Sequence, residues 1–333
     1  LPISVGNRLE GCLPLPKLMW LREHESETYA RIRHVLISSK DYLIAQLTGE
    51  CVGDVAACST AGAMNIRNGQ WDAELCEVAE IDMTILPQLH NPQDRISIVT
   101  ESAAQRAGFS AGTAVYAGIG DAGATTLASG VSRPGQYNIN IGTSGWIATV
   151  SPEPFTDKPG AANLAFGVEE GFVNAVPFLN AGDVHKWVTG VFADGDYAEA
   201  HRLIETSEPG SNGVMCLPYL VGERFPVMNP NIRGAYVGLD PDTTKADMMR
   251  AALEGVAFSI RQGMESFDAE PTEISLIGGG ARENAWCQIL ADVLEHPIEV
   301  FANADILPAV AMASLVFNAP DLLQSVCERT VYQ

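Results

Sequence analysis

Residues 113–150 read TAVYAGIGDAGATTLASGVSRPGQYNINIGTSGWIATV, and this stretch decides the expected fold. Its first seven residues form a short apolar run that predicts a buried strand. Residues 121–130 are small residues and helix formers, so they predict a helix after a turn. Residues 136–141 and 145–150 predict a hairpin closed by a Gly-Thr-Ser turn. Strands that alternate with helices and hairpins predict an α/β protein with mixed sheets.

The flanking sequence continues this alternation. Residues 16–49 have apolar positions at helical spacing, which predicts two or three helices, the last ended by Gly49 as a C-cap. A further helix is expected at 71–80. Downstream, the pattern predicts helices at 183–192, 197–206, 245–267 and 284–294, and strands at 214–220, 233–239 and 273–277.

Length and composition indicate a folded protein with two domains. The chain has 333 residues, of which 47% are hydrophobic and 18% charged. Single hydrophobic cores stop growing at roughly 250–300 residues. The best boundary follows the helix that begins at Asp121, which divides the chain into residues 1–131 and 132–333.

The net charge limits the partners. The chain carries 41 acidic and 20 basic residues, a formal net charge of −21. Such a field repels nucleic acids and anionic membrane surfaces, so neither is an expected partner. An anionic ligand such as a nucleotide would need backbone N–H groups, a metal ion or the few basic residues.

The cysteines and the apolar runs indicate a cytoplasmic protein. The seven cysteines are scattered, without a Cys-x-x-Cys pair, so reduced and mostly buried thiols are expected. No apolar run approaches the ~18 residues of a membrane span, and the first residues lack the layout of a signal peptide. Leu1 is not an initiator methionine, so a missing natural N-terminus is expected.

The first glycine-rich site surrounds Asp121. Gly118–Gly123 matches the letters G-x-G-x-x-G of a dinucleotide fingerprint. That interpretation is disfavoured, because Asp121 would face the pyrophosphate and no acid occurs between Asp121 and Glu153, where one is required roughly 20 residues on. Alternatively, Asp121 is itself the functional group at the end of a strand, with Gly120 leaving room for a substrate hydroxyl. An N-cap role for Asp121 remains open at this point.

Two more strands end in glycine-rich turns. Gly142, Thr143 and Ser144 join the two hairpin strands, and their backbone N–H groups and hydroxyls suit a phosphate oxygen. A plain hairpin turn is the alternative. Gly278–Gly280 lies between a strand and a helix and would let a flat ring or a phosphate approach the backbone, although a flexible loop also fits. Three such strand ends together indicate a nucleotide held in a cleft between two domains.

Several spaced motifs carry a family resemblance. In chain order they are PKLMWLREH (16–24), KDYL (40–43), LTG (47–49), LPYLVGER (217–224), GAYVGL (234–239), Asp247-Met248 and AALE (251–254). With the glycine loop at 278–280, Trp286 and Asp292, they resemble the FGGY family of carbohydrate kinases over about residues 16–300. The xylulokinase and gluconokinase branches are the most similar.

The resemblance implies a two-domain actin and hexokinase type of fold, which is ribonuclease H-like, with a cleft between the domains. Residues 1–131 would be the remainder of the first, sugar-binding domain and 132–333 the second, ATP-binding domain. Family members open with an Asp-x-Gly-Thr phosphate loop that no residue here supplies, so a shortened N-terminus is expected, and the C-terminus also looks shortened. Asp121 matches the catalytic aspartate and would contact the substrate together with Gly120. The residues assigned to ATP are Gly142, Thr143, Ser144, Gly278, Gly279, Gly280, Ala281 and Asn284.

The implied activity is transfer of a phosphoryl group from ATP with Mg²⁺ to a small-molecule sugar, ketose, polyol or sugar acid. Mg²⁺ keeps much of its water shell, so no protein metal site is expected. A non-catalytic actin-like nucleotide-binding fragment is the alternative, and a dehydrogenase is a distant third. The particular sugar and the oligomeric state stay open, a homodimer being one arrangement considered.

Other candidates are weaker. The six histidines form no cluster at ligand spacing, so they are interpreted as surface or hydrogen-bonded residues. Trp187 is expected to pack in a helix face, with a place in the sugar site as the alternative. Glu223 and Arg224 are interpreted as an ion pair that shapes the cleft or as substrate contacts.

Overall fold

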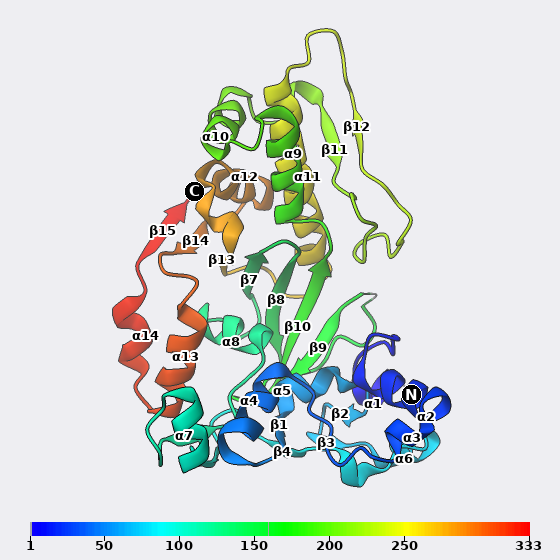
Figure 1. Ribbon diagram of the computed structural model, residues 1–333. Coiled ribbons are helices and arrows are strands. Elements are labelled where there is room, and N and C mark those ends of the chain that lie inside the picture. The colour runs from blue at the N-terminus through cyan, green and yellow to red at the C-terminus, as the bar shows by residue number, and fades with distance from the viewer. Residues whose placement is uncertain (1, 159) are drawn as a thin grey trace.

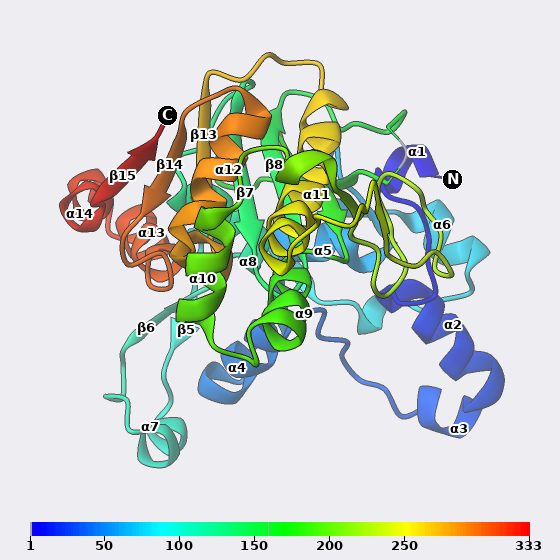
Figure 2. The ribbon, with the colours of Figure 1, turned by 90° about the horizontal axis from the view of Figure 1, so that it is seen from above.

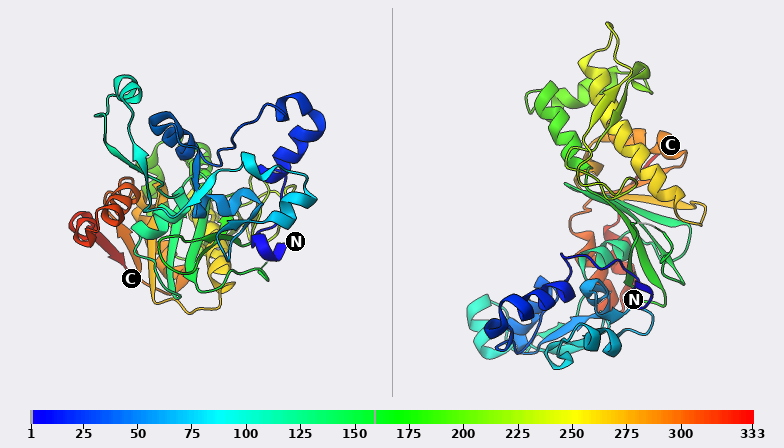
Figure 3. Two further views of the ribbon diagram at one scale, coloured as in Figure 1. Left: turned by 90° about the horizontal axis from the view of Figure 1, so that it is seen from below. Right: turned by 90° about the vertical axis from the view of Figure 1, so that its right-hand side faces the viewer.

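The computed structural model describes residues 2–158 and 160–333. Figure 1 shows two regions, one above the other: the N-terminal third of the chain lies below, and a seven-stranded sheet with its helices lies above. The right-hand view of Figure 3 shows the same two lobes from the side. The chain termini lie in different regions.

The lower region is built from short helices and three two-stranded sheets. Its strand pairs are β1 (Val52–Asp54) with β4 (Gln88–His90), β2 (Met64–Asn65) with β3 (Gln70–Trp71), and β5 (Arg95–Ile98) with β6 (Ala114–Tyr116). Only the first of these pairs is parallel. The helices are α1 (Pro2–Val5), α2 (Pro14–His24), α3 (Ser26–Tyr29), α4 (Ser39–Thr48), α5 (Val55–Cys58), η1 (Ser59–Ala61), α6 (Ala73–Val78), η2 (Met83–Ile85), α7 (Glu101–Ala107) and α8 (Asp121–Ala128).

The upper sheet has the strand order β15-β14-β13-β7-β8-β10-β9. Strand β13 is parallel to both β7 and β14, and the other pairs are antiparallel. The strands are β7 (Gln136–Ile141), β8 (Gly145–Ser151), β9 (Ala162–Ala165), β10 (Phe172–Phe178), β13 (Glu273–Ile277), β14 (Ile298–Phe301) and β15 (Arg329–Tyr332). A separate antiparallel pair joins β11 (Met215–Leu217) to β12 (Ala235–Val237).

One face of the upper sheet is covered by helices. Because side chains alternate along a strand, Tyr137, Ile139 and Ile141 of β7 all lie in one hydrophobic cluster, together with Leu253 and Trp286 from the helices. Figure 2 shows these helices over the strands. They are α9 (Gly182–Phe192), α10 (Tyr197–Thr206), η3 (Ser211–Gly213), α11 (Lys245–Glu265), η4 (Gly279–Arg282) and α12 (Asn284–Leu294).

The other face of the sheet meets the lower region. Val150 and Val173 pack in one cluster with Ala56 of α5 and Ala124 of α8. Helix α13 (Leu307–Val316) also packs against α8, and Leu307 shares a cluster with Ala128. The remaining helix is α14 (Pro320–Val326). The start of α8 is therefore placed between the two regions.

The expected α/β fold is confirmed, and the hairpin and the elements at 197–206, 273–277 and 284–294 lie where the sequence placed them. The helix expected at 121–130 begins at Asp121 as expected and ends at Ala128. The helix expected at 71–80 is wrong at its start, because Trp71 belongs to β3 and its indole N–H donates to Pro87 O at 2.8 Å. Strands β9 and β10 were not predicted. The division at residue 131 stays a prediction.

Within the described ranges, the longest helices are too polar or too short to traverse a bilayer.

Candidate active site

The glycine turns after β7 and β13 meet at one edge of the upper sheet. These strands are parallel neighbours, with Ile277 paired to Asn140, so their carboxyl ends lie side by side. Gly278 has φ 101°, and a Cβ there would lie 2.5 Å from the carbonyl oxygen of Ile141. At Gly280, a Cβ would lie 2.4 Å from Ile141 Cγ2. Only glycine allows this approach.

The hairpin turn is fixed to the start of α9. Gly182 N–H donates to Gly142 O at 2.9 Å, and Asp183 N–H donates to Thr143 O at 3.0 Å. A Cβ on Gly182 would lie 2.2 Å from Gly142 O, so the contact requires glycine. The turn and the first residues of α9 therefore form one unit.

Glu223 anchors the chain just before α9. Its carboxylate accepts from Leu179 N–H at 2.7 Å and from Asn180 Nδ2 at 2.8 Å. The expected ion pair with Arg224 is wrong: the Arg224 guanidinium points to Glu10, 4.0 Å away, and only its backbone N–H donates to Glu223. Glu223 is 3% exposed, so it has a structural role.

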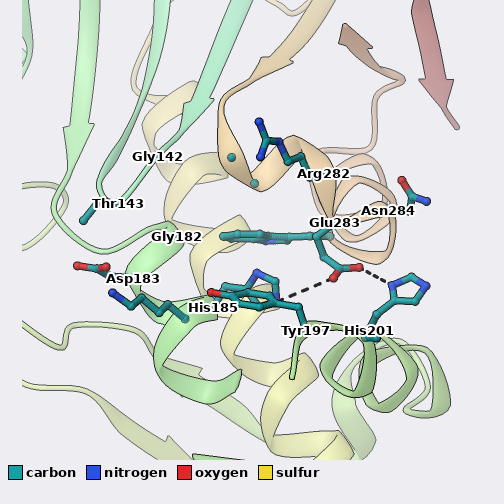
Figure 4. A pocket seen from close by; sticks show the side chains of 15 residues that line it. Gly142, Thr143, Gly182, Asp183, His185, Tyr197, His201, Arg282, Glu283 and Asn284 are labelled. Atoms are coloured by element: carbon teal, nitrogen blue, oxygen red, sulfur yellow. Dashed lines mark hydrogen bonds and ion pairs between the residues drawn. The ribbon is translucent and has the colours of Figure 1, made fainter. Parts of the chain in front are cut away.

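The two glycine turns and α9 enclose a cavity of about 680 Å³, whose lining Figure 4 shows. Its walls come from the β7–β8 turn, α9, α10 and the segment from η4 to α12. The lining residues are Gly142, Thr143, Gly182, Asp183, His185, Lys186, Tyr197, Ala198, His201, Gly279, Gly280, Arg282, Glu283, Asn284 and Trp286.

Glu283 organises the polar side of this cavity. It is 8% exposed and accepts the Ala285 N–H at the start of α12. The His201 Nδ1–H donates to Glu283 Oε1 at 2.6 Å, and this hydrogen bond raises the pKa of His201. His185 lies on the other side, with Nε2 3.9 Å from Glu283 Oε2 (Figure 4). Burial lowers the pKa of His185, which favours the neutral imidazole.

Asp121 lines a second, smaller cavity of about 350 Å³. It is the first residue of α8, it is exposed, and its carboxylate accepts the Ala122 N–H at 2.8 Å. Gly120 is the N-cap of α8, so the N-cap interpretation of Asp121 is wrong by one position. An exposed carboxylate at the start of a helix is accessible to a ligand hydroxyl.

Lys40 also lines the second cavity. Its ammonium is 2.6 Å from Asp41 Oδ1 and 2.7 Å from Asp54 Oδ2, and both carboxylates are fully buried. Burial acts to lower the pKa of Lys40, but Asp54 and Asp41 raise it above its usual value. The ammonium is therefore charged and doubly paired.

The structure thus brings together some predicted site residues and separates others. Gly142, Thr143, Gly279, Gly280 and Asn284 line the larger cavity, and Ser144, Gly278 and Ala281 are their chain neighbours. Asp121 and Gly120 line the smaller one, and the two linings share no residue.

Sequence reasoning missed the cluster around Glu283. The expectation that all six histidines are surface or hydrogen-bonded residues is wrong for His185, whose Nε2 is buried without a hydrogen-bond partner in the described part of the chain. Trp187 lies in α9, is 41% exposed and lines neither cavity, so its alternative place in a ligand site has no support from the two linings. No sequence signal joins His185, His201 and Glu283, because they come from different elements.

No group of three or more His, Cys, Asp or Glu side chains within the described ranges is arranged to hold a metal ion. The cysteines are all unpaired thiols, and Cys58, Cys76, Cys216 and Cys287 are buried.

Family models match both regions of the chain. The N-terminal domain of the FGGY family of carbohydrate kinases matches residues 4–128, and its C-terminal domain matches residues 137–314. The chain belongs to the FGGY family of carbohydrate kinases. Its fold is accordingly the two-domain, actin-like fold of the FGGY kinases.

Individual members of the FGGY family resemble the chain along most of its length. A xylulose kinase from Staphylococcus xylosus is 33% identical over 310 residues, covering 90% of this chain and 62% of that protein. A gluconokinase from Bacillus subtilis (strain 168) is 30% identical over 310 residues, covering 89% of this chain and 60% of that protein. The chain therefore spans about three fifths of the length of these two relatives.

A solved FGGY structure superposes on nearly the whole chain. The xylulose kinase from Rhodospirillum rubrum matches with a TM-score of 0.87 and 27% sequence identity, covering 99% of this chain and 69% of that one. The two-lobed arrangement in Figure 3 is thus shared with that kinase.

Proposed function

We propose that this chain carries the phosphoryl-transfer site of a carbohydrate kinase, which moves the γ-phosphoryl group of ATP to a hydroxyl of a sugar, ketose, polyol or sugar acid. The main support is that the turn at Gly142–Thr143 and the loop at Gly279–Gly280 line one cavity of about 680 Å³. Membership of the FGGY family agrees with this chemistry.

The larger cavity suits a nucleotide. Thr143 and Ser144 expose hydroxyls, and the glycines leave backbone donors uncovered, which suits phosphate without requiring positive charge. Lys186 and Arg282 also line the cavity, and neither forms an ion pair with a residue of the described ranges. They can therefore meet the charge of the phosphates in a protein of net charge −21.

Mg²⁺ would be held mainly by phosphate oxygens and water. Asp183 would be the protein group available to it, because the other lining carboxylate, Glu283, is already hydrogen-bonded to His201. When bound, the ion would neutralise charge that develops on the transferred group.

Asp121 would act as the general base. Its exposed carboxylate would accept the proton of the attacking sugar hydroxyl, a contribution of roughly 10²–10⁴-fold. Most of the rate enhancement would come from positioning and from electrostatic stabilisation of the phosphoryl group. The sugar would occupy the smaller cavity, where Ser39 and Thr60 supply hydroxyls.

Asp121→Ala tests this proposal. Sugar-dependent ADP release should be abolished, while ATP affinity measured by calorimetry stays close to that of the wild type. Asp321→Asn is a matched control, since Asp321 is an exposed acid in the first turn of α14. Turnover of Asp121→Ala within tenfold of the wild type would overturn the assignment.

A second candidate is a nucleotide-binding module without catalysis. The separation of the two cavity linings favours it, because Asp121 and the glycine turns share no cavity. Such a module would bind ATP but release no ADP with any sugar in a panel of pentuloses, gluconate, glycerol and other polyols.

A further inference from the structure

Glu283 has one carboxylate oxygen that the protein leaves without a hydrogen bond. Its Oε1 accepts from His201 Nδ1–H at 2.6 Å and from the Ala285 N–H at 3.2 Å. Its Oε2 accepts no hydrogen bond from the described residues, and His185 Nε2 lies 3.9 Å from it, which is too long for one. Polar atoms of buried side chains usually have at least one partner, so this oxygen is a candidate acceptor for a ligand.

The free oxygen of Glu283 is open to the larger cavity. Glu283 as a whole is 8% exposed, and it is one of the lining residues. His185 Nε2 belongs to the described side-chain atoms that are fully buried without a hydrogen-bond partner, whereas Glu283 Oε2 does not. A ligand in the cavity can therefore reach the carboxylate oxygen but not the imidazole nitrogen.

His185 is held too firmly to supply the missing donor. Its ring packs edge-on against Tyr197 and Trp286, with centroids 5.3 and 5.6 Å apart. Trp286 is fully buried, so the imidazole is packed against a fixed wall. The ring would have to leave these contacts to come within hydrogen-bond distance of Glu283.

Glu283 lies away from the turn to which the phosphates are assigned. Figure 4 shows Thr143 and Asp183 at one side of the cavity and Glu283 with His201 at the other. A carboxylate would repel phosphate, so its place at this side suits the nucleoside part of a nucleotide. The donors of that part are the ribose hydroxyls and the N–H groups of the base.

The next residue, Asn284, leaves the ribose to Glu283. Asn284 also lines the cavity, and its Oδ1 accepts from Tyr332 O–H at 2.9 Å, so its Nδ2 is available to a ring nitrogen of the base. In any nucleotide the ribose lies between the base and the phosphates. A carboxylate accepts strong, charge-assisted hydrogen bonds from ribose hydroxyls, as an acidic residue does in dinucleotide-binding folds.

We propose that Glu283 accepts a hydrogen bond from a ribose hydroxyl through Oε2 and makes the site selective for ribonucleotides over deoxyribonucleotides. This inference rests on the proposed function, since it takes the larger cavity as the nucleotide site. It adds a specificity-determining residue to that site, because Glu283 is not among the residues that the family resemblance assigns to ATP.

Calorimetric titration of the full chain with ADP, 2′-deoxy-ADP and 3′-deoxy-ADP tests the inference without requiring turnover. At least one deoxynucleotide should bind about tenfold more weakly than ADP, as expected for the loss of a hydrogen bond to a charged group. Equal affinities of all three would overturn the inference alone. Failure of every nucleotide to bind would overturn the proposed function together with it.

Inosine diphosphate, which lacks the adenine amino group and keeps both ribose hydroxyls, separates ribose from base. Its affinity does not enter the prediction for the deoxynucleotides. If it binds more weakly than ADP while both deoxynucleotides bind as ADP does, Glu283 contacts the base and the inference fails.

Glu283→Ser removes the carboxylate and keeps a side chain that can cap α12, where Glu283 is the N-cap. In this variant the affinity ratio of ADP to the weaker deoxynucleotide should fall to about one. Glu205→Gln is the matched control and should keep the ratio, because Glu205 is an exposed acid 3.4 Å from the other ring nitrogen of His201 and does not line the cavity. If Glu283→Ser weakens all three nucleotides by the same factor, the role of Glu283 is structural and the inference fails.

Discussion

His201 Nδ1 lies 2.6 Å from Glu283 Oε1, which places a titratable ion pair in the wall of the larger cavity. The residues are 82 positions apart, on α10 and at the start of α12. Glu205, 3.4 Å from the other ring nitrogen, and His185, 3.9 Å from the other Glu283 oxygen, also face this pair. The charge of the cavity wall therefore depends on whether His201 is protonated.

Nucleotide affinity should fall as the pH rises through the pKa of His201. The hydrogen bond to Glu283 raises this pKa, so the ion pair is complete below the ordinary value of the histidine and is lost above the raised one. Glu283 is then uncompensated and repels the phosphates. ADP titrations between about pH 5.5 and 8.5 should show the step in the wild type and not in His201→Gln. His24→Gln, in α2, should keep it. Identical pH profiles for the wild type and His201→Gln would contradict this prediction. Because ADP itself titrates equally in both experiments, its effect cancels when the two profiles are compared.

Gly182→Ala should weaken nucleotide binding by displacing the phosphate turn. The added Cβ would lie 2.2 Å from Gly142 O, so the turn and α9 must separate. Overpacking of this kind costs about 1–3 kcal/mol, and we expect a rise in the Kd for ADP of about tenfold.

Gly190→Ala is the matched control for that variant, because Gly190 lies in the same helix and a Cβ added there would have no neighbouring atom within 4 Å. It should leave ADP affinity unchanged and stabilise the protein by about 0.5–1 kcal/mol. If both glycine variants bind ADP as the wild type does, the turn is not part of the nucleotide site.

Local features of the sequence predict much of the upper sheet and its turns. The hairpin of β7 and β8 follows from apolar runs with glycine between them, and α12 follows from helical spacing after Gly280. By contrast, β10 contains Pro177 and the buried Asn174, and these residue types are typical of loops, so the sequence does not predict a strand there. In the structure, the buried Asn174 amide donates a hydrogen bond from Nδ2 to Ser151 Oγ on the neighbouring strand. Such compensation is a tertiary contact and leaves no pattern in the sequence.

The sequence predicts those site residues that belong to a motif within one turn or helix. It does not predict residues that meet only because different helices pack together. Gly142 and Gly279 are marked by their glycine-rich turns, and both line the larger cavity. Glu283 and His201 carry no such mark, since they are 82 residues apart and lie on different elements. The sequence marks Lys40 only as part of a family motif, whereas the structure pairs its ammonium with the buried carboxylates of Asp41 and Asp54.

Lys40→Met should destabilise the fold. It leaves Asp41 and Asp54 buried without their counter-ion, and breaking a buried pair in this way typically costs about 3–5 kcal/mol. Urea denaturation followed by circular dichroism measures the loss. Lys17→Met is the matched control, because Lys17 is exposed in α2 and forms no ion pair with a described residue, so its effect should stay within about 0.5 kcal/mol. Equal stability of the two variants would show that the carboxylates around Lys40 are solvated or protonated in the folded protein.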